Sequence, residues 1–340
     1  GTETISVLDA FAGGGSIPFE ACRLGLNTIA NELNPVASII QRATIEYPKY
    51  FGPSLELDIR KTGEAIQERI ENEMRPFFPS IDGEYDHNYI WVRTVRCSKC
   101  ELSIPLSPNW HLDRSNKLVF LPKVPSLNEG NCCTFSIMKK PDDFDPDMGT
   151  IKRGICTCPR CGIVLDGTYI KNEAQDGRLG SQMAAVQSIR MEGTRRVKRF
   201  REVHGLDVEA YEKASEALKK RLPDWQMRGL VPVEEIPEGN KTREPRNVGI
   251  LKWYQMFNDR QLLVHLATLE AILDYPWDEV KDEKKREALR VYCQMAFDKC
   301  LDYNALLNTW ESTRLIVKHV FQRHDFAFKW SYGEIDGAGN

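Results

Sequence analysis

The pattern of apolar and polar positions predicts a strand, a turn and a helix at the start of the chain. A short apolar run over residues 5–8 ends at Asp9, and three consecutive glycines follow at 13–15. Apolar residues then recur at helical spacing between residues 17 and 24, which is the pattern of one helix face. Glycines let a backbone approach a ligand closely, and a helix N-terminus attracts anionic groups, so this turn is typical of a nucleotide-type site.

A second apolar run over residues 28–30 is followed by Glu32. An α/β fold places its ribose-binding acid at about this position. The third glycine of the dinucleotide fingerprint is absent, because Pro18 stands there. A small-residue turn between two acids suits S-adenosylmethionine as well as NAD. The alternative is an ordinary tight turn that binds nothing.

The pattern continues with alternating helices and short apolar runs. Asn34 and Pro35 are expected to open a helix, as N-cap and first helical residue. A third strand is expected at 55–58 and a helix at about 62–75. This order predicts one half of a doubly wound parallel sheet.

Beyond this point the composition changes. From about residue 81 to 170 the chain is rich in β-branched, aromatic, proline and cysteine residues, and strands are expected at 89–92 and 117–121. This predicts a small β module inserted into the α/β domain. Helical spacing returns at 208–222, 261–273, 284–300 and 313–321. A connector rich in proline and glycine runs to about residue 249.

Composition and charge limit the partners and the compartment. The 340-residue chain has a net charge of −3, so any nucleic-acid surface must be local. No apolar run approaches the ~20 residues that span a bilayer, and no signal peptide precedes Ile5, so no membrane partner is expected. The chain begins with Gly1 rather than Met, which suggests a piece of a longer protein. The spacing of its cysteines favours metal over disulfides, so we expect a reducing, cytoplasmic location.

The metal signal comes from two Cys-x-x-Cys pairs, Cys97 with Cys100 and Cys158 with Cys161. Two such pairs complete the tetrahedral four-thiolate site that Zn²⁺ prefers. All four positions are filled by protein, so the zinc is expected to be structural. The alternative is four free buried thiols. Cys156 is a spare that fits the pattern less well.

A dense basic run is the candidate for contact with a phosphate backbone. Its members are Arg190, Arg195, Arg196, Lys198, Arg199 and Arg201. The alternative is that the run is simply a solvent-exposed face of the protein, as most runs of charged residues are. No pair of histidines has metal spacing and no nucleophile motif occurs, so no catalytic residue is assigned.

With these motifs in place, the chain resembles the adenine-specific DNA methylases that contain a zinc ribbon. The resemblance lies in segments 8–18, 32–37, 93–97, 104–106, 177–180, 257–263 and 302–304. It implies a Rossmann-like methyltransferase fold with a partial doubly wound sheet, an inserted zinc-ribbon β module and a helical segment. The implied cofactors are S-adenosylmethionine and structural Zn²⁺, and the implied partner is DNA.

The resemblance also assigns residues and parts of the chain. Cofactor-binding roles are implied for Asp9, Phe11, Ala12, Gly13, Gly15, Glu32, Leu33, Asn34 and Asp58. Asp9 would approach the methionine amine, Glu32 the ribose hydroxyls and Asp58 the adenine amine. The expected parts are a cofactor-binding α/β part at 1–80, a zinc-ribbon insertion at 81–175, a basic segment with helix and connector at 176–248, and a helical part at 249–340 leading back to the methyltransferase core.

One departure from the family pattern concerns the acceptor site. The family's Asp/Asn-Pro-Pro-Tyr motif, which orients the extruded base, does not occur in this sequence. We therefore expect little methyl transfer by this chain alone, with the motif supplied by missing segments or a partner subunit. Cytosine-N4 and RNA guanine-N2 methylation are alternatives, as is a zinc-dependent nucleic-acid-binding or assembly module without catalysis.

Overall fold

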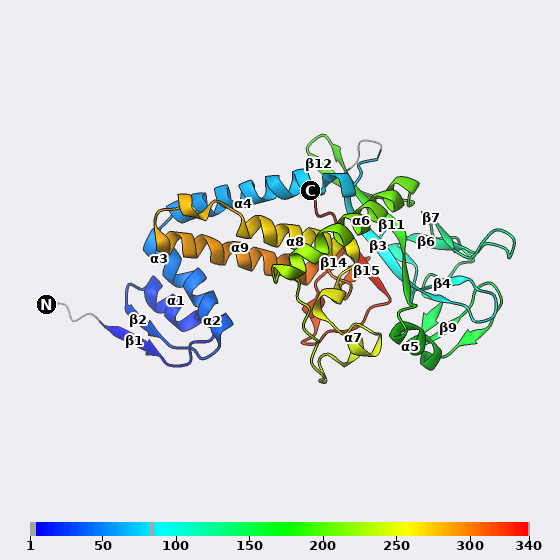
Figure 1. Ribbon diagram of the computed structural model, residues 1–340, viewed down its shortest axis with the longest axis horizontal. Helices are drawn as coiled ribbons and strands as arrows, with labels where there is room; N and C mark the ends of the chain where they lie inside the picture. Colours follow the sequence, from blue (N-terminus) through cyan, green and yellow to red (C-terminus); the bar gives the residue numbers. More distant parts are fainter. Residues whose placement is uncertain (1–4, 82–84, 339–340) are drawn as a thin grey trace. The chain divides into compact units, whose positions relative to one another are not determined.

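The computed structural model has a mixed α/β fold that divides into two compact units (Figure 1). The structure describes residues 5–81 and 85–338. Unit 1 contains residues 1–69 and 268–298, and unit 2 contains residues 70–267 and 299–340. Within the described residues, no helix combines the length and the apolar character needed to cross a membrane.

Unit 1 begins with a strand, a helix and a second strand. Strands β1 (Ser6–Asp9) and β2 (Asn27–Ala30) pair in parallel, from Ser6 opposite Asn27 to Asp9 opposite Ala30. Helix α1 (Ser16–Arg23) connects them. The strand, turn, helix and second strand expected from the apolar pattern are confirmed.

A run of helices follows: α2 (Pro35–Gln41), a π-helical turn η1 (Arg42–Glu46) and α3 (Tyr47–Phe51) lie in unit 1, and α4 (Ser54–Met74) belongs to unit 1 up to residue 69 and to unit 2 from residue 70. The Asn34 side chain accepts a hydrogen bond from the Val36 N–H at 3.0 Å, and Pro35 occupies the first helical position. The predicted cap is therefore confirmed.

The expected third strand at 55–58 is wrong, because these residues belong to α4. Leu55, Ile66, Ile70 and Met74 are buried at helical spacing, whereas Leu57 is 59% exposed. The alternation of Leu and acidic residues imitates a strand, but the buried stripe follows the helical period. Among the described residues, the parallel sheet of unit 1 therefore has two strands rather than half of a doubly wound sheet.

Two later helices match the predicted spacing, α8 (Asp259–Leu273) and α9 (Glu283–Tyr303). Side chains of α9 form hydrogen bonds with residues 42 and 43 in the helical run of unit 1. Arg42 forms two hydrogen bonds with the Glu287 carboxylate, at 2.8 and 2.9 Å, and the Tyr292 hydroxyl donates to the Ala43 carbonyl at 2.5 Å.

Unit 2 is built on an antiparallel sheet around the long strand β3 (Tyr85–Arg96). Strands β11 (Gly180–Glu192) and β15 (Ser331–Ile335) flank β3, β12 (Arg195–Arg201) pairs with β11, and β4 (Ser103–Leu106) pairs with the end of β3 (Figure 1). Segments from distant parts of the sequence thus share one sheet, including the basic segment.

Two three-stranded sheets add to the β structure of unit 2. One contains β5 (His111–Asp113), β6 (Leu118–Lys123) and β7 (Thr134–Lys139), and the other contains β8 (Ile151–Lys152), β9 (Ile155–Thr157) and β10 (Val164–Leu165). The strands predicted at 89–92 and 117–121 are confirmed within β3 and β6.

The remaining helices of unit 2 are α5 (Gly167–Gln175), α6 (Gly205–Met227) and α7 (Arg243–Asn247), with short 3₁₀ turns η2 (Arg75–Phe77), η3 (Trp253–Met256) and η5 (Val320–Gln322). A further turn, η4 (Trp277–Glu279), lies in unit 1. Helix α6 contains the helix predicted at 208–222. The helix predicted at 313–321 is wrong, because β13 (Thr309–Glu311) and β14 (Ile316–Lys318) form a hairpin there.

Candidate metal centre and cofactor loop

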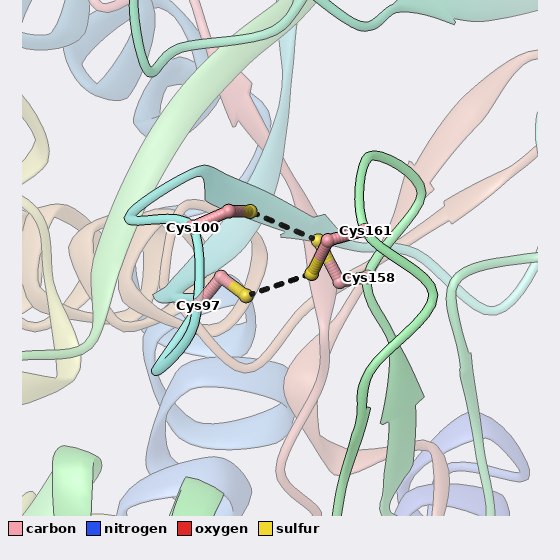
Figure 2. Close-up of side chains that lie close together, drawn as sticks. All are labelled: Cys97, Cys100, Cys158 and Cys161. Atoms are coloured by element: carbon pink, nitrogen blue, oxygen red, sulfur yellow. Dashed lines mark hydrogen bonds between the residues drawn. The ribbon is translucent and has the colours of Figure 1, made fainter. Parts of the chain in front are cut away.

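Four cysteine side chains lie together in unit 2, where two tight turns face each other (Figure 2). The Sγ atoms of Cys97 and Cys161 are 3.6 Å apart, as are those of Cys100 and Cys158, and all four lie within 4.8 Å of one another. A zinc–sulfur distance of about 2.3 Å requires sulfur–sulfur edges of about 3.8 Å in a tetrahedron. The site can therefore hold a metal such as zinc, with the ligands that the spacing predicts.

The two turns share one backbone geometry. Glu101 and Gly162, each directly after the second cysteine of its pair, have φ of 64° and 73°. Their N–H groups donate to the carbonyls of Cys97 and Cys158, both at 3.0 Å. The Sγ atoms of Cys97 and Cys158 accept from the N–H groups two and three residues later. Burial raises the pKa of both thiols, whereas these hydrogen bonds lower it. The hydrogen bonds therefore favour the thiolate, which is the form of cysteine that binds metal ions.

Arg160 connects the two turns, a role that the sequence reasoning missed. Its Nε lies 3.5 Å from the Cys100 Sγ, and its guanidinium donates to the Gly130 carbonyl and the Asn131 side-chain oxygen, both at 2.8 Å. Burial raises the pKa of the Cys100 thiol, but the hydrogen bonds from Arg160, from the Leu102 N–H and from the neighbouring cysteines together outweigh burial and lower that pKa to about 6. An arginine inside a Cys-x-x-Cys turn was the available signal.

The spare cysteine lies in the core beside the metal site. Cys156 is fully buried with Val95, Leu102 and Ile104. Burial raises the pKa of its thiol to about 12. Among the described cysteines, the four-sulfur cluster therefore contains only the members of the two pairs.

The glycine turn of unit 1 is held by two side chains. The Glu32 carboxylate accepts from the N–H groups of Gly13, at 2.6 Å, and Asn34, at 2.9 Å. The bond from Asn34, followed by that from Gly13, holds the pKa of Glu32 below its usual value. Gln41 donates through Nε2 to the Gly13 carbonyl at 2.7 Å, a contact that the sequence did not reveal.

The three glycines of this turn differ in their backbone conformation and in the space that a Cβ atom would have. Gly13 and Gly15 have φ of 52° and 89°, which favours glycine. A Cβ on Gly15 would lie 2.8 Å from the Gln41 Cγ, whereas a Cβ on Gly13 or Gly14 would meet nothing within 4 Å. Gly15 is therefore required by packing, Gly13 by its backbone conformation, and the surface beside Gly14 is open.

The other predicted cofactor residues surround this turn. The Asp9 carboxylate accepts from the Phe11 N–H at 3.3 Å. The Ala12 N–H donates to the Asn31 carbonyl at 3.0 Å, which connects the ends of β1 and β2. Phe11 is 91% exposed and Leu33 is 96% exposed. Asp9, Gly13 and Glu32 are thus brought to the carboxyl ends of the two parallel strands.

Asp58 is positioned differently from the expectation. It lies on α4 rather than at the end of a third strand, because that strand does not form. Its carboxylate accepts from the Lys285 Nζ of α9 at 2.8 Å.

The basic segment forms the antiparallel hairpin of β11 and β12, which distributes its cations over two faces. The register places Arg190 opposite Val197 and Lys198 opposite Ile189. Side chains alternate along a strand. One face therefore carries Arg190, Arg195, Arg199 and Arg201, and the other carries Arg196 and Lys198.

The cations of the hairpin differ in their contacts. Arg201 is mostly buried and contacts Asp207 at 2.7 Å and Asp86 through Nε at 3.2 Å. Arg199 pairs with Glu192 at 2.8 Å, and Lys198 donates to a backbone carbonyl at 2.7 Å. The exposed members of the run are Arg190, Arg195, Arg196, Lys198 and Arg199.

Comparison with known proteins gives no match: no protein-family model, curated protein or solved structure is significantly similar to this chain.

Proposed function

We propose that this chain is the cofactor-binding and zinc-ribbon portion of an S-adenosylmethionine-dependent DNA adenine-N6 methyltransferase. The single observation that carries the proposal is the parallel strand–helix–strand unit, whose glycine turn lies between Asp9 and Glu32. Ligands of α/β sheets bind at the carboxyl ends of parallel strands, where both acids lie. The motif resemblance supports the same function.

The contacts of the turn suggest a role for each residue. Glu32 uses its carboxylate to hold the Gly13 and Asn34 N–H groups, and its remaining lone pairs can accept from ribose hydroxyls. The exposed side chains of Phe11 and Leu33 offer apolar surface to an adenine ring. Asp9, at the end of β1, is suited to the methionine ammonium group.

The zinc ion in this proposal is structural. Four cysteine ligands leave no coordination position for water or substrate, which is typical of structural zinc. Arg160 supplies a positive charge beside the four thiolates. We expect the ion to stabilise the fold of the two turns rather than to take part in chemistry.

The exposed cations of the β11–β12 hairpin are the proposed contact with DNA. Phosphate contacts of this kind position a nucleic acid without reading its sequence. These cations also favour the second candidate, a zinc-dependent nucleic-acid-binding module without catalysis. In both cases we expect little methyl transfer by the chain alone, because it lacks the acceptor motif.

Calorimetric titration of the zinc-loaded chain with S-adenosylmethionine tests the proposal. We expect wild type to bind, and Asp9→Ala and Glu32→Gln each to weaken binding about tenfold, the effect of losing one charged hydrogen bond. Glu20→Gln is the matched control, because Glu20 is an exposed acid of α1 that pairs with Arg23 at 2.7 Å.

This titration and a DNA-retardation assay together separate the two candidate functions. A folded, zinc-loaded wild type that does not bind S-adenosylmethionine contradicts the methyltransferase proposal. If that chain still retards duplex DNA, and the double variant Arg195→Met, Arg196→Met does not, the binding module is the better description.

A further inference from the structure

Arg93 is a buried arginine whose charge has no acidic partner among the described residues. It lies on β3 with 8% of its surface exposed, and its Nε and Nη2 have no hydrogen-bond partner. Its Nη1 reaches the Ser181 hydroxyl at 3.5 Å. Burial lowers the pKa of this guanidinium. A buried charge without a partner is costly, so its presence requires a reason.

Two other arginines of unit 2, the fully buried Arg260 and the mostly buried Arg201, have the acidic partners that Arg93 lacks. Arg260 makes two hydrogen bonds with the Glu334 carboxylate, at 2.7 and 2.9 Å, and Arg201 contacts two aspartates. Arg93 instead lies over the rings of Phe328 and Tyr332, at 5.4 and 5.1 Å from their centroids. The rings attract the cation but accept no conventional hydrogen bonds.

Two further buried donors lie in this region, and neither has a partner in full hydrogen-bond geometry. They are the Tyr332 hydroxyl and the Asn258 Nδ2. The Asn258 Oδ1 accepts from the Gln261 N–H at 2.8 Å, which fixes the amide so that its nitrogen remains as a donor. Burial raises the pKa of the Tyr332 hydroxyl to about 12, and nearby Asn258 and Ser181 act against this shift without reaching full hydrogen-bond geometry.

A cavity of about 590 Å³ lies next to this cluster, and Ser181 belongs to both. Its walls come from β3, β6, β7, β11 and the start of α6. The apolar lining includes Trp91, Met183 and Tyr211, with the Trp91 and Tyr211 rings 4.8 Å apart. The charged lining consists of Lys123, Glu202 and Glu212.

We propose that Arg93, Ser181, Tyr332 and Asn258 bind the oxyanion group, carboxylate or phosphate, of a ligand whose apolar or aromatic body occupies this cavity. The four side chains offer a guanidinium, two hydroxyls and an amide N–H, which together form a donor set for an anionic acceptor. Such an acceptor satisfies donors that the chain leaves unpaired and neutralises the buried charge. The inference does not depend on the proposed methyltransferase function.

The test compares three probes at constant ionic strength in chloride: inorganic phosphate, benzoate and deoxyadenosine monophosphate. The full zinc-loaded chain is melted and titrated by calorimetry with each probe at millimolar concentration. We expect at least one probe to raise Tm. A response to phosphate alone identifies a bare oxyanion site, a response to benzoate a carboxylate ligand, and a stronger response to the nucleotide a nucleotide ligand.

Two variants and a control make the test specific. Tyr332→Phe removes one hydroxyl and is expected to weaken binding about tenfold. Arg93→Met is expected to abolish the Tm shift, while its Tm in chloride equals or exceeds that of wild type because an unpaired buried charge is gone. Arg243→Met makes the same change at an exposed position of α7, outside the cavity and the basic hairpin, and is expected to respond as wild type.

Three results overturn the proposal. The first is that no probe shifts the Tm of wild type. The second is that Arg93→Met keeps the full shift. The third is that Arg93→Met is strongly destabilised in chloride, which would mean that the rings and core around Arg93 already compensate its charge.

Discussion

At the residue scale, the guanidinium of Arg201 is shared by two buried carboxylates. Asp86 and Asp207 both contact it, and both are almost inaccessible to solvent. One cation between two anions leaves a net negative charge in a buried place. Burial, opposed by Arg201 and reinforced by Asp207, raises the pKa of Asp86 to about 6.

This raised pKa predicts a pH dependence of stability. The folded chain keeps the Asp86 proton up to about pH 6, whereas the unfolded chain releases it near the ordinary value of 3.8. The Asp86 contribution to the free energy of unfolding is therefore present below pH 4 and falls as pH rises to 6, by about 3 kcal/mol. Urea denaturation of wild type and Asp86→Asn between pH 4 and 7 measures it.

The comparison has a clear control. The difference in free energy of unfolding between wild type and Asp86→Asn is expected to decline across this range, whereas the difference for Asp142→Asn, in an exposed loop, is expected to stay constant. A wild type that gains stability relative to Asp86→Asn as pH rises would contradict the raised pKa.

Arg160 gives a second prediction at this scale. Arg160→Met removes the donor to the Cys100 sulfur and the bonds to the loop at Gly130. We expect zinc affinity to fall about 10-fold to 100-fold, as for other partners of metal ligands. Competition with a chromophoric chelator measures this affinity. Lys99→Met makes the same charge change at an exposed position of the first turn, and equal losses in both variants would mean that charge alone matters.

At the element scale, prediction from the sequence worked where one local period controls burial. Strands β1 and β2 and helices α8 and α9 form where the local spacing of apolar residues predicts them. The error at 313–321 has a tertiary cause. Leu315 adopts a φ of 54° in the β13–β14 turn, and Val317 packs so closely on β15 that a Cβ on Gly333 would lie 2.4 Å from it.

The glycine turn supplies the prediction for this scale. Gly15→Ala forces an unfavourable φ and a contact of 2.8 Å with Gln41, so we expect it to lower the free energy of unfolding by about 1–3 kcal/mol and to weaken S-adenosylmethionine binding. Gly14→Ala, where the new methyl meets nothing within 4 Å, is expected to change stability little. Thermal unfolding and calorimetric titration compare the two variants. Equal losses of stability and binding in both variants would contradict the view that Gly15 is required by its packing against Gln41.

At the scale of the whole molecule, what could be predicted depends on how far apart the contributing residues lie in the chain. The four cysteines of the candidate metal site were found because each pair is local, so only the meeting of two pairs had to be assumed. The Arg93 cluster has no such local signal, because Ser181, Asn258 and Tyr332 come from distant segments. The five-stranded sheet of unit 2 was missed for the same reason, since its strands span residues 85–335.

Removal of zinc tests the proposal that a metal held by the four cysteines stabilises the fold. The four sulfurs close a core that contains Leu102, Ile104 and Cys156, and binding to thiolates is coupled to folding. We therefore expect a chelator to speed amide hydrogen exchange at 95–106 and 151–170. Exchange in β1 and β2 is expected to stay unchanged, because unit 1 supplies none of the four ligands.

Hydrogen exchange followed by mass spectrometry, with bound zinc measured in parallel, makes this comparison. Cys158→Ser is expected to exchange rapidly in the ligand turns before any chelator is added, whereas Cys132→Ser, at an exposed cysteine outside the cluster, is expected to respond as wild type. Unchanged protection in wild type after complete loss of zinc would mean that the apolar core holds the two turns without the metal. The ion would then not be structural, and the proposed role of the four cysteines would have to be abandoned.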